Sequence, residues 1–147
     1  MKIVIIDRYP ILRRGLSEFL SGHFYDLVTI ECSCKEELMA HSSGADISLI
    51  IIALNQSLDL NDIDEINGAR KWCPAAKLVG YVDSSSPFII KMYANAGLSG
   101  YYFKQDNLED FTSYIYQILN FENEKKTLLC MKQVKLLHKS ERDYSRS

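Results

Sequence analysis

The sequence is poor in residues that interrupt regular structure. It has 7 Gly and 3 Pro among 147 residues, a content that argues against collagen-like, low-complexity or disordered segments. No apolar run approaches the roughly 20 residues that a membrane-spanning helix needs, so we expect no contact with a membrane. The N-terminus reaches Asp7 after a short apolar run, which is too short for a signal peptide. These absences predict a soluble cytoplasmic protein.

The chain also lacks the residue patterns that hold metals. Its four cysteines are Cys32, Cys34, Cys73 and Cys130, and the first two stand too close together for a zinc knuckle with no second pair following. Each cysteine has apolar neighbours, which is typical of buried thiols. We therefore expect no metal site and no cofactor.

Charge is unevenly distributed along the chain. Residues 125–147 contain seven Lys or Arg and two Asp or Glu, whereas residues 1–124 contain ten basic and seventeen acidic side chains. A basic tail on an acidic body favours contact with nucleic acid or an acidic partner. A solvated C-terminal helix explains the same asymmetry, and both interpretations stay open.

Short apolar runs alternate with segments of helical periodicity over about 120 residues. The expected strands are 3–6, 27–30, 47–54, 77–82 and 100–103. The first expected helix begins near Pro10. Four more helices are expected over 34–41, 63–72, 84–96 and 107–121, and Ser33 is the expected N-cap of the helix over 34–41. Such alternation predicts an α/β fold, a (βα)5 doubly wound parallel sheet in the flavodoxin-like order 2-1-3-4-5. The functional crevice should then lie at the carboxyl ends of strands one, three and four.

Three segments carry a resemblance to a known family: residues 3–16, 50–55 and 94–104. The first segment reads as a strand, then Asp-Arg-Tyr-Pro, then a helix that contains Leu-Arg-Arg-Gly-Leu. The other two segments match later motifs of the same family, in the same order along the chain. Residues 1–121 thereby resemble a CheY-like receiver domain of response regulators in the NarL/FixJ family, whose members carry a LuxR-type helix-turn-helix. The resemblance implies a role in two-component signal transduction, phosphorelay and transcription regulation.

The resemblance also implies a phosphorylation pocket. In this family two acids after the first strand hold Mg²⁺, and an aspartate ending the third strand accepts the phosphoryl group. A hydroxyl ending the fourth strand and a lysine after the fifth bind that group. The matching positions here hold Asp7, Arg8, Ala53, Val82 and Lys104. Three of the five groups are missing, so we expect no phosphorylation and no bound Mg²⁺ at this site.

Two of these positions lead to further hypotheses. Arg8 and Lys104 together would fill the emptied acidic pocket with positive charge, with Arg8 paired to Asp7 or Asp83, unless Arg8 points into solvent. Tyr101 occupies the position of the family's switch aromatic. It either sets the interface made by the fourth and fifth helices or packs locally on a short edge strand.

The function predicted from the sequence is that of an atypical receiver, a pseudo-receiver, which is not an enzyme. It would act independently of phosphorylation, through a protein partner or a homodimer, and aromatic residues near its end, Tyr102 to Tyr116, would suit such a surface. The alternatives are a conventional phospho-switch using another site and a flavodoxin-like cofactor binder, although the first βα turn lacks a phosphate cradle. Residues 122–147 are expected to form a basic linker or helical tail, a remnant of a LuxR-type DNA-binding domain. DNA would be contacted only through a missing C-terminal domain.

Overall fold

Strands and helices alternate throughout the part of the chain that can be described. The computed structural model describes residues 1–41, 43–55, 59–83 and 86–120. The strands are β1 (Lys2–Ile6), β2 (Val28–Cys32), β3 (Leu49–Leu54), β4 (Lys77–Val82) and β5 (Gly100–Phe103). The helices are α1 (Pro10–Ser21), α2 (Lys35–His41), α3 (Leu60–Trp72), α4 (Pro87–Ala96) and α5 (Leu108–Asn120).

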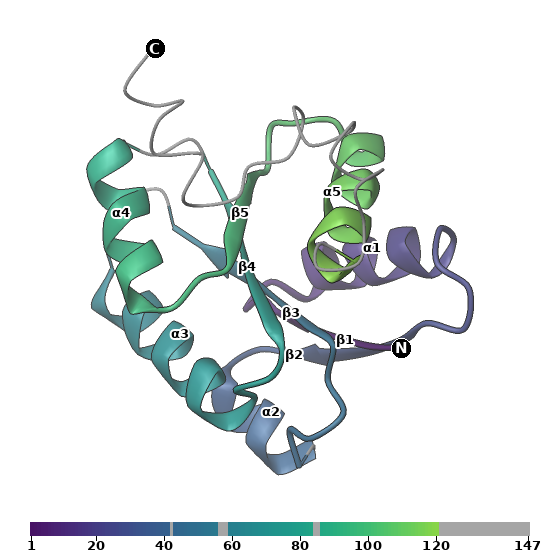
Figure 1. The fold of residues 1–147 in the computed structure, drawn as a ribbon, viewed down its shortest axis with the longest axis horizontal. Coiled ribbons are helices and arrows are strands. Elements are labelled where there is room, and N and C mark those ends of the chain that lie inside the picture. Colours follow the sequence, from purple (N-terminus) through teal and green to yellow (C-terminus); the bar gives the residue numbers. More distant parts are fainter. Residues whose placement is uncertain (42, 56–58, 84–85, 121–147) are drawn as a thin grey trace.

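The strands form one parallel sheet in the order β2-β1-β3-β4-β5, which confirms the predicted fold class and strand order. In the register, Ile6 of β1 lies beside Ile52 of β3, and Leu54 of β3 lies beside Val82 of β4. The carboxyl ends of β1, β3 and β4 therefore meet at one edge of the sheet. Helices α1 and α5 cover one face, and α2, α3 and α4 cover the other (Figure 1).

Alternating side chains of each strand supply two separate hydrophobic cores. Between the sheet and α2, α3 and α4 lies the α2–α4 core, which includes Val4, Ile50, Ile52, Leu54, Ile66, Leu78, Val82, Ile90, Tyr93 and Tyr101. Between the sheet and α1 and α5 lies the α1–α5 core, which includes Ile3, Ile5, Leu16, Leu20, Ile51, Val79, Tyr102, Phe111, Tyr114 and Ile115. Burial on both faces explains why the predicted central strands read as continuous apolar runs.

Several boundaries differ from the prediction for identifiable reasons. Helix α3 starts at Leu60, three residues early, because the side chain of Asp59 caps it by accepting the Asn61 N–H at 2.8 Å. Helix α2 starts at Lys35, and the N–H and hydroxyl of Ser33 both donate to Glu37. Ser33 therefore binds a side chain of the first turn instead of capping backbone groups.

The prediction of buried cysteines is confirmed for two of the three cysteines that the structure describes. Cys32 and Cys73 are buried free thiols, as predicted, whereas Cys34 is only half-buried. Cys130 and the expected tail, 122–147, lie outside the described residues. Within the described segments, no helix is both long and apolar enough to cross a membrane.

The aromatic residues near the end of the domain pack inward. Tyr102, Phe111 and Tyr114 are buried in the α1–α5 core, with the Tyr102 and Phe111 ring centroids 4.7 Å apart. The expectation that these three residues form a partner-binding surface is therefore wrong, because their side chains are buried between the sheet and the helices α1 and α5. Tyr116, which is 60% exposed, does reach the surface.

The close approach of α5 to β5 yields a test of this packing. A Cβ added at Gly100 would meet the hydroxyl of buried Tyr114, so Gly100→Ala should lower the free energy of unfolding by about 1–3 kcal/mol. Gly15 of α1 is the matched control, because a Cβ there meets no atom within 4 Å. Gly15→Ala should raise the free energy of unfolding by up to about 1 kcal/mol through helix propensity. Urea unfolding of both variants measures the difference, and equal effects would contradict the described packing.

Candidate functional site

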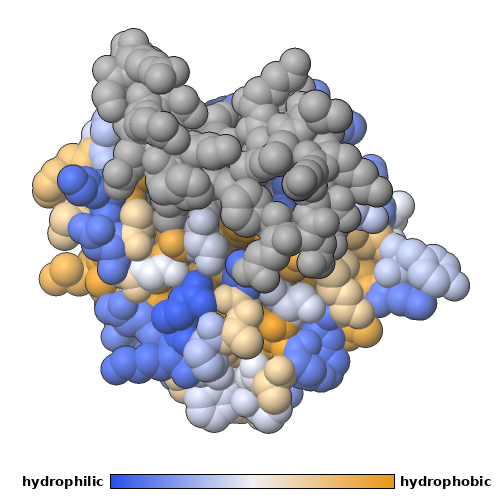
Figure 2. Space-filling model, in the orientation of Figure 1, coloured by the Kyte–Doolittle hydropathy of each residue, from blue (hydrophilic) through white to orange (hydrophobic). Residues whose placement is uncertain are grey.

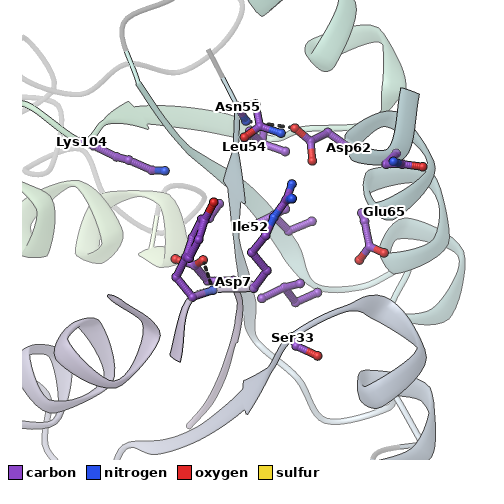
Figure 3. Close-up of a pocket in the computed structure, with 13 residues that line it drawn as sticks. Asp7, Ser33, Ile52, Leu54, Asn55, Asp62, Glu65 and Lys104 are labelled. Atoms are coloured by element: carbon purple, nitrogen blue, oxygen red, sulfur yellow. Dashed lines mark hydrogen bonds between the residues drawn. The ribbon is translucent and has the colours of Figure 1, made fainter. Parts of the chain in front are cut away.

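A pocket of about 300 Å³ opens at the carboxyl edge of the sheet, where the switch point of the strand order was expected. It is formed by the turn after β1, the end of β3, the first turns of α3 and the residue that follows β5. Its lining residues are Ile6, Asp7, Arg8, Tyr9, Ser33, Ile52, Ala53, Leu54, Asn55, Asn61, Asp62, Glu65 and Lys104. Lys104 enters from one side and the acidic residues of α3 face it from the other (Figure 3).

Asp7 fixes the turn between β1 and α1. Its buried carboxylate accepts the N–H of Tyr9 at 2.9 Å, and its carbonyl oxygen accepts Nη1 of Arg13 at 2.9 Å. The carboxylate of Asp7 is therefore held in place by its own turn. The structure brings it together with Arg8, Ala53 and Lys104 in one pocket, as the sequence predicted.

Arg8 lines the pocket but remains exposed to solvent. Its guanidinium carbon lies 5.9 Å from the centre of the Tyr9 ring, a distance compatible with a cation–π contact. Arg8 forms no ion pair with any residue that the structure describes, so the predicted pairing with Asp7 or Asp83 is not observed. The interpretation in which Arg8 points into solvent therefore agrees better with the structure than the predicted ion pair, although the side chain still lines the pocket.

The end of β3 contributes only apolar side chains to the pocket. Ala53 lines it as a half-buried methyl group, between Ile52 and Leu54, which line it too. Val82 does not line the pocket, because its side chain is fully buried in the α2–α4 core. Tyr101 is buried in that same core, with its ring centroid 5.2 Å from that of Phe103. The packing interpretation of Tyr101 thus agrees with its position.

The backbone of Lys104 is hydrogen-bonded to the end of the neighbouring strand β4. Its N–H donates to the carbonyl of Val82 at 2.6 Å, and its Nζ lies 5.9 Å from the centre of the Tyr81 ring. Among residues 1–41, 43–55, 59–83 and 86–120, Lys104 makes no ion pair with a carboxylate. The lysine is therefore held over an aromatic ring instead of beside an acid.

The acidic wall that α3 adds to the pocket was missed from the sequence. Asp62 and Glu65 both line the pocket, and Asp62 is only 6% exposed. A signal for Asp62 was present, since the buried positions Ile66, Ala69 and Cys73 predict that position 62 also faces the sheet. The polar composition of residues 55–61 concealed it by suggesting a loop.

Asp62 connects the pocket to α4 through buried hydrogen bonds. Its Oδ2 accepts the N–H of Asn55 at 2.9 Å and the hydroxyl of Tyr93 at 3.3 Å. Burial raises the pKa of the Asp62 carboxyl above its ordinary value, and the Asn55 N–H opposes this shift. Burial likewise raises the pKa of Glu65, which accepts the N–H of Lys35 at 2.7 Å. The acidic wall is therefore made of carboxylates that already have donors.

Solved structures share this architecture. A LuxR-family DNA-binding response regulator from Silicibacter pomeroyi superposes with a TM-score of 0.68 at 16% identity, covering 82% of this chain and 91% of that one. A CheY-like receiver domain protein from Methanospirillum hungatei gives a TM-score of 0.66 at 19% identity, covering 81% and 93%. The fold is thus the CheY-like receiver fold.

A sequence relative agrees with the fold. The transcriptional regulatory protein ComA of Bacillus subtilis is 27% identical over 124 residues, which is 82% of this chain and 57% of ComA. The chain thus spans little more than half of the length of that relative, and no family model matches it. Together these similarities confirm the predicted resemblance to receiver domains of LuxR-type response regulators.

The buried position of Asp62 predicts how stability depends on pH. Because its folded pKa lies above its unfolded pKa of about 3.9, the folded state binds more protons, and stability contributed by this group falls as pH rises through that window. We expect Asp62→Asn to exceed wild type in free energy of unfolding at pH 7, with the gap closing as pH approaches about 4. Glu18→Gln, an exposed change on α1, should leave the profile unchanged. Urea titrations at several pH values measure both, and a gap that widens toward acid pH would contradict the assignment.

Proposed function

We propose that this receiver domain is a pseudo-receiver, a non-enzymatic signalling module that acts by binding protein partners without being phosphorylated at the pocket. Its supporting observation is Ala53, which places a methyl group at the pocket where the family resemblance assigns the phosphoryl-accepting carboxylate. A methyl group has no oxygen with which to form an acyl phosphate. The neighbouring strand residues, Ile52 and Leu54, offer no substitute.

The remaining carboxylates of the pocket are poorly suited to replace it. Asp7 accepts the N–H of Tyr9, and Asp62 accepts two donors while being almost fully buried. Glu65 accepts the N–H of Lys35 at 2.7 Å. Each of these groups is therefore already engaged in holding the local structure.

The cations of the pocket disfavour a divalent metal. Arg8 stands where the family resemblance assigns the second Mg²⁺ ligand, and it shares the pocket with Lys104. Two positive side chains at one cavity repel a further cation, and Arg8 cannot itself coordinate a metal. Without metal and nucleophile, the domain would signal through its surface rather than through a change of covalent state.

Surface side chains support action through protein contacts. Ile11 and Leu12 of α1 are 82% and 52% exposed, and Phe88 of α4 is 64% exposed. The face in Figure 2 shows hydrophobic residues in small patches among hydrophilic ones, below the part drawn in grey. A protein partner or a homodimer would bury the exposed apolar side chains of Ile11 and Leu12. Regulation of transcription and a cytoplasmic location complete this proposal, and DNA binding would need residues beyond the receiver domain.

Phosphodonor treatment tests this function directly. Incubation of the full chain with acetyl phosphate and Mg²⁺ should leave its intact mass unchanged, because Ala53 cannot form an acyl phosphate. A receiver with an aspartate at the matching position is the positive control and should gain one phosphoryl group. A stoichiometric mass gain by the wild-type chain would overturn the proposal and indicate a conventional phospho-switch at another residue.

A restoration experiment shows whether the missing nucleophile and metal ligand are the reason. The variant Arg8→Asp, Ala53→Asp returns both groups to the pocket that already holds Asp7 and Lys104. We expect this double variant, checked for its fold by circular dichroism, to gain Mg²⁺-dependent phosphorylation. The matched variant Arg8→Asp, Ala53→Asn should stay unmodified, because the side-chain amide of asparagine cannot act as the nucleophile.

A further inference from the structure

We propose that residues 125–137 of this chain dock onto an apolar hollow at the amino edge of the sheet, opposite the pocket. This segment has four lysines, no acidic residue, and the apolar residues Leu128, Leu129, Met131, Val134, Leu136 and Leu137. The inference goes beyond the proposed function and does not depend on it, because the hollow and the pocket share no lining residue.

The amino-edge hollow has a volume of about 400 Å³ and is lined by Met1, His23, Phe24, Tyr25, Tyr116 and Leu119. These residues come from the N-terminus, the loop between α1 and β2, and the last two turns of α5 (Figure 1). Tyr25 is 91% exposed, more than any other large apolar or aromatic side chain among the described residues, and Tyr116 is 60% exposed. Exposed tyrosines beside apolar side chains are typical of surfaces that bind protein segments.

The loop that displays Tyr25 is anchored to the N-terminus. The N–H of Val28 donates to the carbonyl of Met1 at 2.9 Å, and the Met1 ammonium donates to the carbonyl of Asp26 at 3.3 Å. Asp26 itself has a φ of 55°, a left-handed conformation that aspartate adopts more readily than most residues. Because the loop is already fixed, a docking segment finds a formed surface and loses less entropy in ordering it.

The point where α5 ends favours the tail of the same chain as the occupant. Leu119 lines the hollow, and Asn120 is the last residue of α5. Residues 121–127 can span up to about 23 Å, which is enough for the following residues to turn back over the end of α5. Such a tether holds the segment at an effective concentration on the order of millimolar, well above that of a second copy in dilute solution.

The composition of the tail also matches the hollow. Cys130, Val134 and Leu137 recur at spacings of four and three, which predicts one apolar side of a helix, and amphipathic helices bind apolar grooves through such a side. Lysine ammonium groups are attracted to the faces of exposed tyrosine rings. Asp26, next to Tyr25 in the sequence, is exposed and forms no ion pair with the residues that the structure describes.

Docking gives the charge asymmetry of the chain a cause. Residues 1–124 contain seventeen acidic and ten basic side chains, so the basic tail meets an acidic partner in its own receiver. A docked tail covers Tyr25 and Tyr116, whereas a released tail uncovers both tyrosines and its own lysines at once. The hollow therefore couples one surface of the receiver to the segment that follows it.

Paramagnetic relaxation in the full chain tests the docking. A nitroxide is attached at Ser140→Cys, just beyond the proposed segment, in a ¹⁵N-labelled chain that also carries Cys34→Ala and Cys130→Ala. The remaining thiols, Cys32 and Cys73, are buried. We expect broadening of the amide signals of residues 23–26 that does not change with protein concentration, because the contact is intramolecular.

Surface variants separate docking from mere tethering. In Tyr25→Ser, Tyr116→Ser the broadening at the hollow should fall to the level that an undocked tether gives. Phe88→Ser removes a similarly exposed aromatic side chain of α4 outside the hollow, and this matched control should leave the broadening unchanged. In the tail, Val134→Ser should reduce the broadening, whereas the neighbouring change Gln133→Ser should not.

The other occupants of the hollow would give different results. Broadening in a ¹⁵N-labelled chain without nitroxide, mixed with a nitroxide-labelled chain without ¹⁵N, would identify a second copy and overturn intramolecular docking. Broadening that is the same in the parent chain and in the Tyr25→Ser, Tyr116→Ser variant would show that the tail leaves the hollow open to another protein, and would also overturn the proposal.

Discussion

The burial of β3 on both of its faces determines which side chains can reach the pocket. This strand is hydrogen-bonded to β1 and β4 and is covered on both faces by helices, so its residues must be apolar until the strand ends. The pairing of β3 with β1 and β4 places the turn after β1 and the N-cap of α3 beside the last residues of β3. A functional group at the end of β3 can therefore come from one or two side chains only, and here the available position is held by Ala53.

The chemistry of the pocket is divided between two kinds of support. Its carboxylates accept hydrogen bonds from backbone N–H groups and from a buried tyrosine hydroxyl, which orient them. Its cations lie near aromatic rings, 5.9 Å from each ring centre. The acids and the bases of the pocket are therefore held by different kinds of neighbour.

Much of the fold followed from the sequence because it depends on periodicity. The apolar run of β3 and the helical spacing in α1 and α5 are strong signals, and the parallel order follows from their alternation. Asp7, Arg8, Ala53 and Lys104 were placed at one pocket because their strands end at one edge. Val82 was assigned to the same edge, but its side chain alternates toward the core, away from the cavity.

The parts that could not be predicted depend on long-range contacts. Nothing local shows that Asp62 would meet Tyr93, because 31 residues separate them and the pairing exists only once α3 and α4 pack together. The conformation of Arg8 could likewise not be predicted from the sequence, because its flexible side chain could pair with several acids or lie against the adjacent aromatic ring. Such choices are decided by the completed tertiary structure.

The hydrogen bond between Asp62 and Tyr93 has a mechanical consequence. One end of it borders the pocket, and the other is anchored in the middle of α4, whose outer surface carries the exposed Phe88. Because the bond ends on a carboxylate, a change in the charge of Asp62 would change its strength, and with it the contact between α3 and α4. The domain thus contains a short polar linkage from its cavity to its exterior that requires no movement of the buried Tyr101.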